Sequence, residues 1–201
     1  MNKPSTDSNL DLTGQLLIAM PDMSDPRFAR SVVYMCSHSD DGAMGLIVNK
    51  QIVDLDLEQL LGQIDIAAGD SDEPLITAAN LGRPVHNGGP VEAHRGFVLH
   101  SPDYFSTTAS LRIADDICLT ATTDILTAIA SGAGPHHALL ALGYAGWSPG
   151  QLEAEIAANA WLTCPGDTLV VFADDNATKY SLALGKLGIE PSHLVSSAGR
   201  A

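Results

Sequence analysis

Positive charge is scarce in this chain, which has 10 lysines and arginines against 24 aspartates and glutamates and a net charge of −14 at pH 7. Proteins that bind nucleic acid without sequence preference neutralise phosphates with Lys and Arg, and an anionic membrane surface attracts the same residues. The composition therefore disfavours both kinds of partner, including a transcriptional regulator that binds DNA.

Long apolar runs are also absent. The longest nearly apolar stretch, around Ala138–Trp147, is too short to span a bilayer, and residues 1–12 lack the basic-then-apolar pattern of a signal peptide. The three cysteines, at positions 36, 118 and 164, are an odd number and do not suggest a disulfide framework. These absences predict a cytoplasmic protein that is not attached to a membrane.

The 201 residues, 45% of them hydrophobic, suffice for one domain with its own core. We expect this domain over residues 12–189, with a disordered tail at 1–11 and a loose tail at 190–201. Apolar runs bounded by turn residues predict strands, and capped amphipathic segments predict helices. The expected strands are Gln15–Met20, Ser31–His38, Ala43–Asn49, Arg95–His100, Leu111–Thr122 with a turn at 115–116, Ala138–Trp147 and Thr168–Ala173. The expected helices are Asp56–Leu61, Thr123 to just before Gly132, Pro149–Ala160 and Asn176–Leu187, with loops at 67–80 and 86–90. This order predicts a single α/β domain with a mixed sheet.

One segment imitates a hydrolase motif. Gly146–Gly150 reads G-x-S-x-G between a predicted strand and a predicted helix, as a nucleophile elbow does. The oxyanion hole of that fold uses the backbone N–H of the residue after the serine, and here Pro149 has none. We therefore interpret Ser148 as an N-cap, with Gln151 completing an S-x-x-Q capping box.

Cys36 and His38 are two residues apart on a predicted strand, which places both side chains on one face. The remaining histidines lack paired ligand spacing, so no metal site and no cofactor is predicted. Two interpretations of Cys36 remain open. It is either a small buried apolar residue or a reactive thiol whose pKa is lowered by His38 and by Arg27 or Arg30.

The loop around Gly88 and Gly89, followed by Arg95, is the densest cluster of flexible and cationic residues. Paired glycines allow close approach of a ligand, and free N–H groups beside an arginine can hold an anion. A tight turn followed by a strand explains the same residues. We take Cys36, His38, Arg30, Gly88, Gly89 and Arg95 together as the candidate ligand site.

Several segments carry a family resemblance. They are residues 12–21, Phe28 with 30–32, 34–38, 42–46, 88–91, 95–100, 141–147, 155–156 and 159–162. Together they resemble the YqgE/AlgH family, also called UPF0301 or DUF179, over about Leu12 to Ile189. Two positions depart from its usual pattern: Ser37 stands where an acidic residue is common, and Asn87 where an aromatic or apolar residue is usual.

The resemblance implies a single α/β domain with a bent, partly barrel-like sheet and flanking helices, in the bacterial cytoplasm. It implies no established enzymatic activity and no recognised DNA-binding motif. Our leading hypothesis is a non-enzymatic binding or regulatory protein, with self-association into a homo-oligomer as one option. The alternatives are a thiol-based redox or detoxifying activity through Cys36 and a transcriptional regulator, which the net charge disfavours.

Overall fold

The computed structural model describes residues 11–64 and 76–191. Its ten strands are β1 (Gln15–Ala19), β2 (Val32–Ser39), β3 (Gly42–Ile47), β4 (Gln51–Asp56), β5 (Pro84–Asn87), β6 (Val91–His100), β7 (Ser110–Arg112), β8 (Cys118–Thr120), β9 (Ala138–Trp147) and β10 (Trp161–Pro165). The α-helices are α1 (Leu57–Gln63), α2 (Asp124–Ser131), α3 (Gln151–Ala157), α4 (Thr168–Val171) and α5 (Asn176–Lys186), and short 3-10 turns lie at η1 (Pro26–Phe28) and η2 (Ala78–Asn80).

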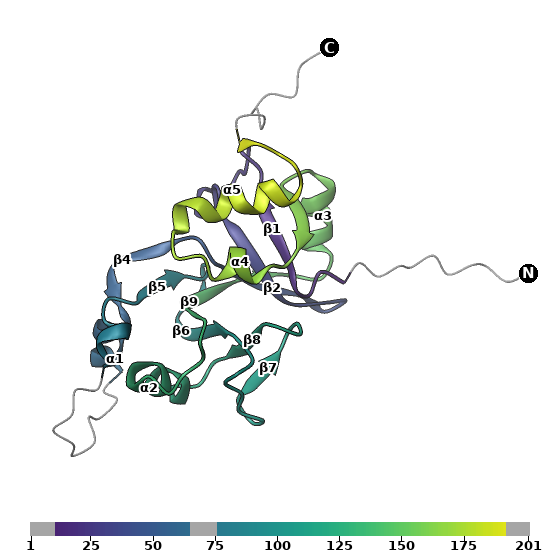
Figure 1. Cartoon of the computed structure of the whole chain (residues 1–201). Helices are drawn as coiled ribbons and strands as arrows, with labels where there is room; N and C mark the ends of the chain where they lie inside the picture. Colours follow the sequence, from purple (N-terminus) through teal and green to yellow (C-terminus); the bar gives the residue numbers. More distant parts are fainter. Residues whose placement is uncertain (1–10, 65–75, 192–201) are drawn as a thin grey trace, which may run out of the picture.

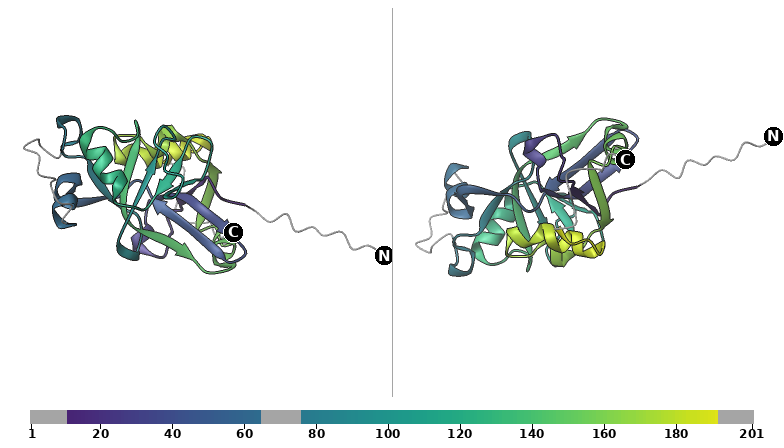
Figure 2. Two further views of the ribbon diagram at one scale, coloured as in Figure 1. Left: turned by 90° about the horizontal axis from the view of Figure 1, so that it is seen from below. Right: turned by 90° about the horizontal axis from the view of Figure 1, so that it is seen from above.

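The strands form one curled sheet in the order β10-β1-β2-β3-β9-β6-β8-β7, with β5 and β4 joined to it through β9 (Figure 1). All pairings are antiparallel except that of β5 with β9, so the sheet is mixed. The views from below and above show it curling around the interior rather than lying flat (Figure 2). The predicted single α/β domain with a bent, partly barrel-like sheet is confirmed.

Strand β9 is shared by both halves of this sheet. Its first half, up to Leu142, pairs with β5 on one side and β6 on the other, whereas Ala145–Trp147 pair with β3. The change of neighbour occurs at Gly143, which has φ +72°. Here the chain leaving β5 crosses β9 so closely that a Cβ on Gly88 would overlap the Gly143 carbonyl oxygen, and one on Gly89 would overlap the Tyr144 backbone. The predicted close approach at the paired glycines is therefore backbone against backbone.

Three clusters of buried side chains fill the fold. The largest lies inside the curl, between the sheet and one face of α5, which contributes Tyr180, Ala183 and Leu184. A second packs α3 against the sheet through Trp147 and Trp161. The third packs α1 and α2 against β5, β6 and β9 at the other end of the sheet, where the two helices lie side by side (Figure 1). Each helix is held by apolar burial on one face.

The structure corrects the expected elements at four places, α4, β10, β5 and β4. Thr168–Ala173 was expected as a strand, but residues 168–171 form helix α4, because the Asp167 carboxylate caps the N–H of Leu169 at 2.9 Å. The edge strand is instead β10, seven residues earlier, which pairs with β1 over its whole length. The segment 86–90 was expected as a loop, yet 84–87 forms β5, and β4 was not expected at all.

The capping prediction for α3 was half right. The helix begins at Gln151 with Gly150 as N-cap, not Ser148. The Gln151 side chain still accepts a hydrogen bond from the Ser148 N–H at 3.0 Å, which is one of the two bonds of a capping box. Ser148 lies in an exposed turn, where Pro149 offers no N–H to an oxyanion.

The expected loop at 67–80 lies outside the described residues up to position 75. Most of the two expected tails, 1–10 and 192–201, also lies outside them. Among the described residues no helix is both long and apolar enough to cross a membrane.

The crossing at Gly88 gives the first prediction. Gly88→Ala should lower the free energy of unfolding by at least about 2 kcal/mol, because two backbones must separate to admit the methyl group. Urea unfolding measures the change. The matched control is Gly185→Ala in α5, where a Cβ meets nothing within 4 Å, so stability should rise by at most about 1 kcal/mol. Equal urea midpoints for Gly88→Ala and the unmodified chain contradict this account of the crossing.

Candidate functional site

Cys36 and His38 do not share a face of β2. The β2–β3 ladder shifts register between Met35 and Ser37, and this bulge inserts one extra residue at Cys36. Cys36 consequently joins the buried cluster inside the curl, and its thiol lies 3.7 Å from the Tyr34 carbonyl oxygen. Burial raises the pKa of the Cys36 thiol to about 12, the opposite of what a reactive thiolate requires.

His38 points the other way, toward α3. Its Nδ1 accepts a hydrogen bond from the Leu12 N–H at 3.2 Å, so the ring proton belongs on Nε2. Nε2 then donates to Glu153 of α3 at 2.9 Å. His38 therefore fastens α3 and the start of the described chain to the end of β2, rather than activating Cys36.

The predicted cations are also separated. Arg30, in a left-handed conformation with φ +54°, lays its guanidinium 4.7 Å from the ring centre of Tyr180. Arg95 pairs with Glu92 at 2.9 Å and lines a wide, open hollow of about 620 Å³ on the β3–β9 surface. Ser37 and Ser39 line that hollow, but Cys36, His38 and Arg30 do not. The six predicted site residues are thus not brought together in one cavity.

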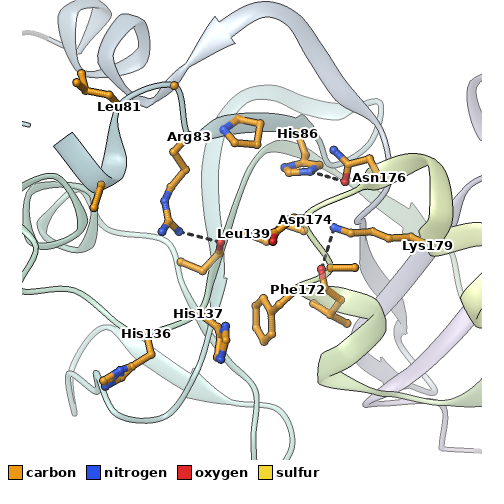
Figure 3. A pocket seen from close by; sticks show the side chains of 16 residues that line it. Leu81, Arg83, His86, His136, His137, Leu139, Phe172, Asp174, Asn176 and Lys179 are labelled. Carbon is orange, nitrogen blue, oxygen red and sulfur yellow. Dashed lines mark hydrogen bonds between the residues drawn. The ribbon is translucent and has the colours of Figure 1, made fainter. Parts of the chain in front are cut away.

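A polar cavity lies elsewhere, between the η2–β5 segment and the start of β9 on one side and α4–α5 on the other (Figure 3). We call it the Arg83–Lys179 cleft, and its volume is about 320 Å³. Its ionisable lining residues are Arg83, His86, His136, His137, Asp174 and Lys179. Only one of the six is acidic, although acidic residues outnumber basic ones by more than two to one in the whole chain.

Lys179 is the buried cation of this cleft, with 1% of its surface exposed. Its Nζ donates to the carbonyl oxygens of Val48 and Val171, both at 2.9 Å. These partners are neutral, and within the described chain no carboxylate oxygen lies within 4 Å of Nζ. Burial lowers the pKa of Lys179 to about 8, with Asp174 opposing the shift. An ammonium has three N–H bonds, so one remains without a protein acceptor among the described residues.

His86 and Arg83 lie in the same cleft as Lys179. His86 Nδ1 lies 3.1 Å from the Leu140 carbonyl oxygen and Nε2 lies 3.0 Å from Asn176 Oδ1. Burial and then the charge of Lys179 lower the pKa of His86, while these two hydrogen bonds oppose the shift. Arg83 is half-buried and donates to the Ala138 carbonyl oxygen at 3.1 Å; burial lowers its pKa, and Asp174 opposes this. Positive charge here is costly, and a negatively charged ligand relieves that cost.

Two stacked rings line one rim of the cleft. His137 stacks on Phe172 with ring centres 5.6 Å apart, and the backbone N–H of the neighbouring His136 donates a hydrogen bond to the Asp103 carboxylate at 2.9 Å. Figure 3 shows both histidines on the side opposite His86 and Asn176. Because His137 is exposed, this rim is open to solvent.

Sequence reasoning missed this cleft, although one local signal was present. Lys179 lies four residues before Ala183, on the buried face of a predicted amphipathic helix. A charged residue at a core position usually has a specific reason. Among the described residues, no three His, Cys, Asp or Glu side chains converge as a metal site.

Comparison with known proteins gives a consistent result. The profile of the AlgH-like family DUF179 matches residues 16–192. A UPF0301 protein from Rhodopseudomonas palustris (strain BisB18) is 56% identical over 190 residues, which cover 94% of this chain and 89% of that one. The solution structure of the AlgH protein from Pseudomonas aeruginosa, a UPF0301 protein, is 41% identical, covers 100% of both chains and gives a TM-score of 0.75. A crystal structure from Corynebacterium diphtheriae, 21% identical over 91% of this chain and 87% of that one, shares the fold with a TM-score of 0.66.

The burial of Cys36 gives a prediction about thiol chemistry. With a pKa of about 12, only about one Cys36 in ten thousand is a thiolate at pH 8, and the folded core shields even that fraction. Alkylation of the native protein should therefore be slow at all three buried cysteines and become fast in urea. One rapid equivalent in the native protein that disappears in Cys36→Ala contradicts this and revives a thiol-dependent activity.

Lys179 gives a prediction about pH. Its pKa is lowered from 10.5 to about 8, so between these values the unfolded chain binds more protons than the folded one. The free energy of unfolding should therefore rise with pH across this window, by on the order of 3 kcal/mol from this group alone. Urea unfolding at several pH values from roughly 7 to 11, which bracket this window, measures the change in the free energy of unfolding.

The comparison variant is Lys179→Met, which keeps the apolar stem and has no titrating amine. The difference in unfolding free energy between the two proteins isolates Lys179 from the other groups that titrate in this range. A pH-independent difference contradicts the lowered pKa.

Proposed function

The chain belongs to the AlgH-like family DUF179, and we propose that it works as a non-enzymatic binding protein whose ligand is a small anion held in the Arg83–Lys179 cleft. The observation that carries the proposal is the pair of cations lining the cleft. Lys179 is fully buried with neutral carbonyl partners, and Arg83 is half-buried with one carbonyl partner. A buried charge without an ionic partner is costly, and a bound anion removes that cost.

The shape of the cleft limits the size of the ligand. About 320 Å³ is at the lower end of the range for small-molecule sites, so a metabolite with a few carbon atoms fits and a nucleic-acid strand does not. Asp174 brings one negative charge to the same wall, which favours a ligand that also carries a hydroxyl or ammonium donor. Carboxylates and phosphates suit the planar fork of Arg83.

A binding role fits the cleft better than a reaction does. His86, the group best placed for proton transfer, uses both ring nitrogens in hydrogen bonds to Leu140 and Asn176. Lys179 likewise uses two of its N–H bonds to hold α4 and α5 against the sheet. These groups are fixed in place, as suits a site that recognises charge without moving protons. A regulatory role follows if the bound anion alters how α4 and α5 are held.

The test is a titration of the full chain with inorganic phosphate at constant ionic strength, followed by amide chemical shifts. We expect saturable shifts at residues 83–86, 136–139 and 172–179, which surround the cleft. Arg83→Gln should weaken binding by about tenfold or more, because a charge-assisted hydrogen bond contributes about 1.5–3 kcal/mol.

The control is Arg95→Gln, which removes an exposed arginine outside the cleft that is already paired with Glu92. It should leave the phosphate affinity unchanged. Shifts scattered over the surface, or equal losses in the two variants, argue for non-specific attraction and against the proposed site.

A further inference from the structure

A second cavity opens on the other side of β9, in the face of the sheet that carries α1 and α2. Its volume is about 200 Å³, and it shares no lining residue with the Arg83–Lys179 cleft. We call it the Gly96 pocket. It is lined by Leu60, Ile64, His94, Gly96, Phe97, Val98, Thr120, Ala121, Thr122, Thr123, Leu126, Leu140, Ala141 and Leu142.

The chemistry of the Gly96 pocket is the opposite of that of the cleft. None of the described residues that line it is Asp, Glu, Lys or Arg, in a chain where 17% of residues are charged. Leu126 and Leu140 belong to the buried cluster beneath α1 and α2, and Ile64 at the mouth is 40% exposed. The polar side chains among the described lining residues are His94, Thr120 of β8, and Thr122 and Thr123 just before α2. An apolar hollow with a few hydroxyls at its rim suits an uncharged ligand.

The pocket exists because Gly96 has no side chain. The backbone conformation at this position does not require glycine. The residue lies in β6 opposite Leu142 of β9, its φ is not in the left-handed region, and a Cβ on it would meet nothing within 4 Å. Gly88, Gly89 and Gly143 differ in this respect, because each lies against another backbone. A strand position that faces a core helix normally carries a side chain that packs there. Among the described residues no side chain fills the space at Gly96, so the strand leaves room there for a ligand.

We infer that the Gly96 pocket binds a small uncharged molecule with one aromatic ring or a short branched chain. An apolar cavity of roughly 150 Å³ holds benzene, so about 200 Å³ accommodates one ring with a small substituent. A bound ring covers Ile64 and completes the contacts between Leu60 of α1 and Leu126 of α2. The threonines at the rim supply one hydrogen bond to a hydroxyl or carbonyl group of the ligand. This site is independent of the anion proposed for the cleft.

The test uses benzyl alcohol as the probe and the full chain. We expect saturable chemical-shift changes at Gly96, Val98, Leu126 and Leu140, and magnetisation transfer between the probe ring and the methyl groups of Leu126 and Leu140. Benzoate, which has the same ring and a negative charge, should bind in the Gly96 pocket at least about tenfold more weakly, as judged from the shifts of Gly96 and Leu126, because the described lining offers it no cation.

Gly96→Val fills the pocket with a side chain that strands favour. It should weaken benzyl alcohol binding at least about tenfold and leave phosphate binding in the cleft unchanged. Gly185→Ala, which also adds a side chain in open space, should change neither. Unchanged benzyl alcohol affinity in Gly96→Val overturns the inference. If Gly96→Val fails to fold, absence of magnetisation transfer to Leu126 and Leu140 in the unmodified protein overturns it alone.

Discussion

The contact on which the rest of this structure depends is the crossing of two backbones at Gly88 and Gly143. It allows β9 to leave the pairing with β5 and enter the pairing with β3 without a break in the strand. Two hydrogen bonds hold the crossing: the Gly88 N–H donates to Leu142 at 2.8 Å, and the Gly88 carbonyl accepts from Ile47 at 2.9 Å. With a side chain at either glycine the two halves of the sheet cannot meet in this way.

The same crossing positions both walls of the Arg83–Lys179 cleft. Just before it, β5 runs parallel to β9 and brings His86 beside Leu140. Beside it, β3 ends at Ile47, and the next residue, Val48, accepts the hydrogen bond from Lys179 that fixes α5. The buried ammonium is thus linked to β9 by three hydrogen bonds, from Lys179 to Val48, from Ile47 to Gly88 and from Gly88 to Leu142, with the peptide bond between Ile47 and Val48 joining the first two. The cationic wall and the sheet wall are parts of one rigid arrangement, as pre-organised recognition requires.

Sequence patterns correctly predicted the strands and helices that are determined by neighbouring residues. Apolar runs located β1, β2, β3 and β9, the turn at 115–116 divides β7 from β8, and the left-handed Gly132 ends α2. The errors arose where the local structure depends on segments that are distant in the sequence. β5 has only four residues and exists because β9 lies beside it, and the bulge at Cys36 reverses the face that simple alternation assigns to His38. The cleft joins segments as far apart as His86 and Asn176, 90 residues, which no local motif links.

Because both halves of the sheet share β9, they are coupled during unfolding. The buried cluster under α1 and α2 and the cluster inside the curl both use side chains of this one strand, Leu140 on one face and Leu139 on the other. We therefore expect the two halves of the sheet to unfold together, since losing one ladder also removes support from the opposite face of the same strand. The two sites sit on a single cooperative unit, and any ligand that holds one of them also raises the free-energy cost of opening the other.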